Sequence, residues 1–243
     1  EVELAPIFGE VIGSAMQPIP RSDACGQEAG RLCESLIGDV VADALRTTYG
    51  TDLAITNSGG IRADLTCPPE GNEFCPSDAG PNVITAGQVL TVLPFGNIAV
   101  TLELTGAELK EMLEAGVRFM PEASGAFPQI SGLCFTYDIA AEPGNRVTGA
   151  VRQAADGSCT GEAIDLTETT TYTLATNDFT ASGGDGYPEL LSRANSREIL
   201  ADVVAAYVAG ESSTLDLPGE PIDPRIEGRI VCEGEGCPAP VGG

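Results

Sequence analysis

The chain has 243 residues, which is enough for one large domain or two small ones with a substantial hydrophobic core. It carries 36 acidic and 12 basic residues, and the net charge of −24 argues against binding of a nucleic-acid backbone over most of the surface. The sequence has no histidine, so it lacks the side chain that most often serves as a general acid or base near neutral pH.

The first predicted elements are two helices. Apolar side chains recur at helix-like spacing within residues 1–20, and this pattern ends near two prolines. Residues 28–48 carry one apolar stripe and predict a second helix, with Arg31 at its beginning. A cation at a helix N-terminus is unfavourable, so we expect an anion near Arg31. An ion pair with Glu28 or Glu34 is the simpler alternative.

Five later segments have the short, apolar and β-branched character of strands. They are residues 53–56, 98–104, 130–139, 147–153 and 172–176. The third and fourth are expected to form a hairpin. After the second strand, the sequence TGAE at 105–108 fits a capping box that begins a helix. Pro188 is expected in the first turn of another helix, and residues 197–209 predict a further amphipathic helix.

We expect one domain over residues 23–230, with a linker helix and entry segment over 1–22 and a stapled tail over 231–243. Sequence rich in Pro, Gly and Glu from 218 onward predicts weak order in this tail. No run approaches the roughly 20 apolar residues that a membrane span needs. The start lacks the basic and apolar leader of a signal peptide, so we expect a mature or recombinant piece of a protein.

The eight cysteines predict disulfides, because a cysteine-only zinc site would need clustered pairs such as C-x₂-C. They fall as sequence neighbours in short loops that contain Gly, Pro and Asp, which is typical of the local staples of exported proteins. The expected pairs are Cys25–Cys33, Cys67–Cys75, Cys134–Cys159 and Cys232–Cys237. Such pairing implies an extracellular, cell-surface or periplasmic location.

Three loops at the ends of predicted strands have the composition of binding loops. They are residues 57–62 (NSGGIR), 93–97 (LPFGN) and 176–187 (TNDFTASGGDGY). Their glycines permit positive φ and close approach of a ligand, while Phe95, Phe179 and Asp185 project from pinned turns. A glycine-rich connection without a ligand is the alternative.

In order and spacing, these loops closely resemble the C-terminal domain of the 5′-nucleotidase family, which includes bacterial 5′-nucleotidases, UDP-sugar hydrolases, 2′,3′-cyclic phosphodiesterases and animal ecto-5′-nucleotidase. The resemblance runs from about Arg31 to Arg229. It implies a single α/β (α+β) domain, in which mixed sheets and helices form a layered α-β-β-α arrangement.

The resemblance also implies a nucleotide site. The family's matching phenylalanines sandwich the base, the position of Asn57 is polar to the edge of the base, and the matching aspartate accepts hydrogen bonds from the ribose. Arg62, and Arg31 by a weaker match, correspond to arginines near the ribose and phosphates. Ordinary core packing is the alternative for each phenylalanine. The expected substrate-binding residues are Arg31, Asn57, Gly59, Gly60, Arg62, Phe95, Phe179, Gly184 and Asp185.

Family members hydrolyse phosphate esters with two divalent metals in an N-terminal metallophosphatase domain, whose D-x-H and G-N-H-E-like motifs do not occur in this sequence. We therefore expect no catalytic residue, cofactor or metal in this chain, and no activity of the chain alone. The leading hypothesis is the nucleotide-recognition domain of an exported hydrolase of nucleotide catabolism, partnered by that N-terminal domain. The alternatives are a stand-alone extracellular nucleoside-binding module and a structural cell-surface domain. Stacking accepts any base, so the sequence favours none.

Overall fold

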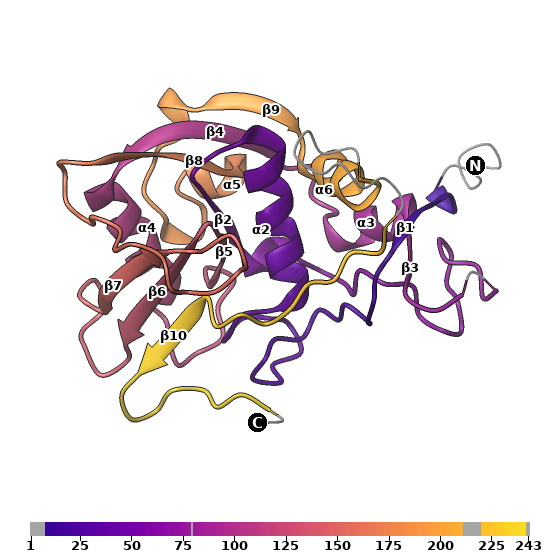
Figure 1. Cartoon of the computed structure of the whole chain (residues 1–243), viewed down its shortest axis with the longest axis horizontal. Coiled ribbons are helices and arrows are strands. Elements are labelled where there is room, and N and C mark those ends of the chain that lie inside the picture. Colours follow the sequence, from indigo (N-terminus) through magenta and orange to yellow (C-terminus); the bar gives the residue numbers. More distant parts are fainter. Residues whose placement is uncertain (1–7, 79, 211–219, 242–243) are drawn as a thin grey trace.

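The structure, a computed structural model, describes residues 8–78, 80–210 and 220–241 (Figure 1). Its centre is a five-stranded sheet in the order β5-β2-β8-β4-β9. The strands are β5 (Pro128–Ser131), β2 (Leu53–Asn57), β8 (Thr171–Asn177), β4 (Ile98–Thr105) and β9 (Asn195–Ile199). β2 and β8 are parallel and the other neighbours antiparallel, so the sheet is mixed, as expected.

Two hydrophobic clusters lie on the two faces of this sheet. One face packs against α2 (Leu36–Tyr49), α3 (Ala86–Val92) and α6 (Leu200–Val208). The other packs against α4 (Gly106–Val117) and a three-stranded sheet in the order β10-β6-β7, formed by Ile230–Glu233, Leu133–Asp138 and Val147–Arg152. β2 shows the alternation, because Leu53 and Ile55 lie in the second cluster and Ala54 lies in the first. The chain is therefore a mixed α/β domain.

Helix α2 begins later than predicted, at Leu36 rather than near residue 28. The Ser35 hydroxyl accepts a hydrogen bond from the Gly38 amide at 3.1 Å and caps the helix, which Gly50 ends in a left-handed conformation. The preceding residues form a disulfide loop instead. Arg31 therefore does not lie at a helix N-terminus, and the argument from the helix dipole does not apply to it.

The helix prediction for residues 1–20 is wrong in part. Residues 11–14 form a strand, β1 (Val11–Ser14), which pairs with β3 (Val83–Thr85). Pairing between distant segments decides this conformation, and a short apolar run does not specify it. The part of this prediction that falls on residues 1–7 lies outside the described residues.

The prediction for residues 188–209 also needs correction. Pro188 starts no helix, because the chain folds back and the Leu190 amide donates to the Ala181 carbonyl at 2.7 Å. Residues 195–199 pair with β4 as the edge strand β9, and α6 begins only at Leu200. The short elements between are α5 (Asp178–Ala181), η2 (Gly184–Gly186) and η3 (Leu191–Arg193), and η1 (Ser58–Gly60) follows β2.

Several local predictions are confirmed. Thr105 and Glu108 form the capping box of α4, and β6 and β7 pair as a hairpin. The strand expected over 130–139 is divided at Gly132, however, because this glycine has a φ of 81° and residues 130 and 131 belong to β5 in the five-stranded sheet. All four expected disulfides are present, with Cα–Cα distances of 5.8 Å (Cys25–Cys33), 5.6 Å (Cys67–Cys75), 5.7 Å (Cys134–Cys159) and 5.7 Å (Cys232–Cys237). None of the described helices combines the length and the apolar character that a bilayer crossing requires.

The tail is more ordered than its composition predicts. β10 pairs in parallel with β6, and the Val241 amide donates to the Ala24 carbonyl at 2.8 Å. Glu34 accepts hydrogen bonds from the backbone amides of Glu227 and Arg229 at 2.7 and 2.6 Å. These contacts hold the C-terminal segment against the loop that precedes α2.

Candidate functional site

The sheet topology brings the three predicted loops to one edge. β2 ends at Asn57 and the parallel strand β8 ends at Asn177, so the loops that follow them leave the sheet on the same side. β4 is antiparallel to β8, with Ala99 opposite Asn177, and its start therefore places residues 93–97 at that side too. Ligands of open α/β sheets bind at such carboxyl edges.

A cavity of about 400 Å³ lies between these loops, within the usual size of a small-molecule site. Eight of the nine predicted substrate-binding residues line it, and the ninth, Gly184, packs beside it. Sequence reasoning missed two lining residues, Asn97 and Gly125. Asn97 closes the 93–97 motif and could have been included with it. Gly125 follows Ser124, and this pair signals a turn but does not indicate a place in the cavity. The lining residues are Arg31, Asn57, Gly59, Gly60, Arg62, Phe95, Asn97, Gly125, Phe179 and Asp185.

The two phenylalanines are not core residues. Phe95 is 61% exposed and Phe179 is 42% exposed, which argues against the alternative of ordinary core packing. The Arg62 guanidinium lies 5.6 Å from the centre of the Phe95 ring. A Cβ at Gly184 would lie 2.6 Å from the Phe179 ring, so this glycine allows the ring to rest on the backbone. Both rings are therefore available to a flat ligand.

Asp185 is held at the cavity by a chain of amides. Asn57 donates its Nδ2 hydrogen to Asp185 Oδ2 at 3.2 Å. The Oδ1 of Asn57 accepts from Asn177 Nδ2 and Thr180 Oγ1, both at 3.3 Å, which fixes the orientation of the amide. Asn97 extends the chain, because its Nδ2 lies 3.4 Å from Asn177 Oδ1. The network leaves the remaining oxygen of Asp185 to accept hydrogen bonds from hydroxyl donors.

Glycines permit the close approach of two loops below the cavity. The Gly59 amide donates to the Gly125 carbonyl at 2.9 Å. A Cβ on Gly59 would lie 3.0 Å from the Gly125 Cα, and a Cβ on Gly125 would lie 3.1 Å from Asp185 Oδ2. A side chain at Gly59 would therefore push the two loops apart, and a side chain at Gly125 would crowd the Asp185 carboxylate in the cavity.

Three arginines gather at this site. Arg62 and Arg31 line the cavity, and no ion pair within the described ranges engages either. The alternative pairing of Arg31 with Glu28 or Glu34 is thus wrong. Arg21 lies nearby, with its Nε donating to the Ile61 carbonyl at 3.0 Å, and burial and the charges of Arg62 and Arg31 lower its pKa. No sequence motif marked Arg21.

A larger hollow of about 610 Å³ lies over β4, β8 and β9, but it contains none of the predicted residues. Its two arginines are already engaged. Arg193 forms an ion pair with Glu108 at 2.6 Å, and Arg197 donates to the Thr101 hydroxyl at 2.9 Å. The smaller cavity is therefore the better candidate for a binding site.

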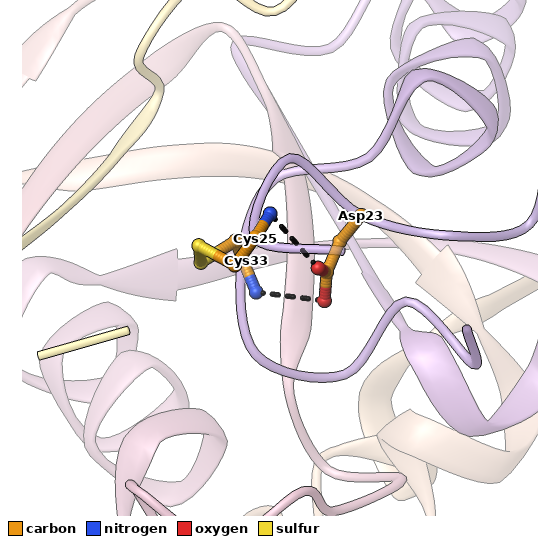
Figure 2. Close-up of side chains that lie close together, drawn as sticks. All are labelled: Asp23, Cys25 and Cys33. Atoms are coloured by element: carbon orange, nitrogen blue, oxygen red, sulfur yellow. Dashed lines mark hydrogen bonds between the residues drawn. A yellow bond between two sulfur atoms is a disulfide. The ribbon is translucent and has the colours of Figure 1, made fainter. Parts of the chain in front are cut away.

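One group in the described part of the chain has the composition of a metal site, namely Asp23, Cys25 and Cys33. Figure 2 shows the two sulfurs joined as a disulfide and the Asp23 carboxylate facing backbone nitrogens. Asp23 accepts four amide hydrogen bonds of 2.9–3.1 Å, from residues 25, 27, 32 and 33. A disulfide and a carboxylate that already accepts four amide hydrogen bonds do not supply the ligands of a dimetal centre. Asp23 instead organises the loop that carries Arg31 to the cavity.

Comparisons with known proteins show what the chain as a whole resembles. The chain is 34% identical over 210 residues to the trifunctional nucleotide phosphoesterase protein YfkN of Bacillus subtilis, covering 84% of this chain and 13% of that protein. It is 33% identical over 190 residues to protein UshA of Escherichia coli, covering 77% and 29%. The structure of a 5′-nucleotidase precursor from Thermus thermophilus superposes with a TM-score of 0.72 at 28% identity, covering 96% of this chain and 41% of that one.

The chain thus spans less than a third of YfkN and of UshA. Residues 11–192 match the family described as 5′-nucleotidase, C-terminal domain. The dimetal site of that family lies in its N-terminal domain, which these 243 residues do not include. By its motifs, its fold and this match, the chain belongs to the 5′-nucleotidase family, as a C-terminal domain.

Proposed function

We propose that the cavity binds a nucleoside or nucleotide. The base stacks between Phe95 and Phe179, the ribose hydroxyls donate to Asp185, and the phosphate lies toward Arg62 and Arg31. The observation that carries the proposal is the meeting of two exposed phenylalanines and one held carboxylate around a single cavity of suitable size. Any base offers a face for stacking, so the ribose is the feature that the polar groups select.

The chain serves in this proposal as the substrate-recognition part of an exported 5′-nucleotidase-type phosphoesterase of nucleotide catabolism, or of a related cyclic phosphodiesterase or UDP-sugar hydrolase. The chain matches only a small part of the length of YfkN and of UshA, which supports the proposal of a larger enzyme whose other part performs the hydrolysis. Four disulfides support an extracellular, cell-surface or periplasmic location. A protein that carries these residues without a metallophosphatase domain would favour the alternative, a binding module.

The test is a calorimetric titration of the chain with adenosine. Replacement of Phe179 by Ala should weaken binding by ~1–3 kcal/mol, or roughly tenfold to a hundredfold, because one face of the base loses its stacking partner. Ile226→Ala is a matched control, since Ile226 is exposed to a similar extent (44% against 42%) and lies outside the cavity. Equal affinity of the parent and Phe179→Ala would contradict the stacking role.

A further inference from the structure

The loop after α4, residues 118–125, reaches the cavity at Gly125 and contacts the Asp185 turn through Arg118. The guanidinium carbon of Arg118 lies 4.5 Å from the centre of the Phe119 ring, which is 44% exposed. Its Nη2 donates to the backbone carbonyl of Asp185 at 3.3 Å. A Cβ at Gly186 would collide with this guanidinium, so the glycine leaves the space that Arg118 occupies.

Asp185 has a backbone conformation that its neighbours must support. Its φ of 54° and ψ of 13° lie in the left-handed region, which residues with a side chain rarely adopt, although aspartate does so more often than most. Gly183 and Gly186 flank it with φ of 89° and 81°. The direction of the carboxylate depends on this turn, because the side chain itself receives a hydrogen bond from Asn57 alone among the described residues.

Two contacts hold this turn, one from Arg118 in the loop and one from Ala126, which directly follows the loop. The buried Tyr187 hydroxyl donates to the Ala126 carbonyl at 2.7 Å and anchors the end of the turn. Arg118 donates a hydrogen bond to the carbonyl of Asp185 itself. Stacking on Phe119 restricts the conformational freedom of the long Arg118 side chain. Neither Arg118 nor Phe119 is among the described residues that line the cavity.

We propose that Arg118, braced by Phe119, is a positioning residue for sugar recognition. It holds the left-handed Asp185 turn so that the carboxylate faces the ribose hydroxyls, and it acts through Asp185 without touching the ligand. This inference rests on the proposed nucleoside function. Because Arg118 is not among the residues that line the cavity with Phe95 and Phe179, it governs binding of ribosides and leaves stacking of a free base unchanged.

The test is an NMR titration of the 243-residue chain with adenosine, AMP and adenine. Arg118→Met keeps the length of the side chain and its packing on Phe119 but removes the donor. We expect it to weaken adenosine and AMP alike by about tenfold and to change adenine by less than about twofold. Arg118→Lys restores one donor and should recover part of the affinity.

Arg197→Met is the matched control, because the Arg197 guanidinium also lies over an aromatic ring, 5.5 Å from the centre of Tyr49, but borders the other hollow. It should bind all three ligands like the parent. Thermal unfolding of each variant reports separately on folding, and Arg118→Lys supplies the comparison if Arg118→Met does not fold.

Three results for a parent that binds adenosine would contradict the positioning role and leave the proposed function intact. These are unchanged adenosine affinity in Arg118→Met, a loss confined to AMP, which would place Arg118 at the phosphate, and an equal loss for adenine. A parent chain that does not bind adenosine would overturn the proposed function, and the inference with it.

Discussion

At Asp185, a carboxylate, a left-handed backbone and an amide donor meet in one turn. Asn57 occupies one oxygen at 3.2 Å, and the amide of Asn57 is itself oriented by Asn177 and Thr180. The other oxygen, Oδ1, receives no side-chain or backbone hydrogen bond from the described residues. A vicinal diol offers two donors close together, and an ionised carboxylate is the acceptor that binds them most strongly.

We therefore expect Asp185→Asn to weaken binding of adenosine by ~1.5–3 kcal/mol, the range for hydrogen bonds to a charged group, and to leave adenine unchanged. Calorimetric titration with both ligands measures the difference. Asp156→Asn is the control, since it removes the same charge from an exposed position outside the cavity. Equal losses for adenine and adenosine would show that Asp185 shapes the cavity as a whole and does not select the sugar.

Between elements, a buried group of charges joins α2 to the C-terminal segment. Arg229 contacts Asp43 through two hydrogen bonds of 2.9 Å and lies 3.5 Å from Asp39. Asp39 is 1% exposed and its oxygens accept no hydrogen bond within the described residues. Burial raises the pKa of Asp39 well above its usual range, with the charges of Glu34 and Asp43 adding to the effect and Arg229 opposing it.

This pKa has a consequence for stability. A carboxyl group with a higher pKa in the folded chain binds its proton more tightly there, so its stabilising contribution is complete below the unfolded pKa of ~3.9 and is lost as pH rises through the folded pKa. Asn is neutral at any pH. Asp39→Asn should therefore gain free energy of unfolding relative to the parent as the pH rises from the unfolded pKa of ~3.9 to about 8, as measured by urea unfolding. A difference that stays constant over this range would contradict a raised pKa.

Elements were predictable from the sequence where local signals decide them. The capping box of α4, the β6–β7 hairpin and the strands β2, β4 and β8 follow from caps and periodicity. β1 and β9 were not predicted, because each becomes a strand only by pairing with a segment that is distant in the sequence, β3 and β4 respectively. The same distinction applies to the cavity. Phe95 and Asp185 stand in glycine-rich motifs, whereas Gly125, Arg21 and Arg118 reach the site only through the tertiary fold.

At the scale of the whole molecule, the net charge of −24 repels a nucleotide from most of the surface. Attraction of a phosphate must therefore be local, and the fold supplies it by collecting Arg21, Arg31 and Arg62 beside one cavity. Their guanidinium groups form no ion pair with a described carboxylate, in a chain with three acidic residues for each basic one. This concentration of charge favours the anionic end of a ligand over a neutral one at this place.

The chain as it stands is not expected to catalyse hydrolysis. The sequence has no histidine. In the candidate metal-ligating group among the described residues, the two cysteines form a disulfide and Asp23 accepts hydrogen bonds from backbone amides. Hydrolysis of a phosphate ester by this family needs two divalent metals, and this group does not supply the ligands for them. We expect the purified chain to release no phosphate from AMP with magnesium, manganese, cobalt or zinc. Binding of adenosine by the same preparation would show that it is folded.

Metal-dependent release of phosphate that persists through purification, and that falls in step with affinity in Phe179→Ala, would contradict this expectation and locate a catalytic centre in these residues. Release that does not respond to Phe179→Ala would instead indicate a contaminating phosphatase. If the expectation holds, a protein that carries the metallophosphatase domain of the family ahead of these residues should be active. Substitutions at Phe179 and Asp185 should then impair its hydrolysis of AMP while leaving metal binding intact, because the proposed function assigns recognition and chemistry to separate parts of the molecule.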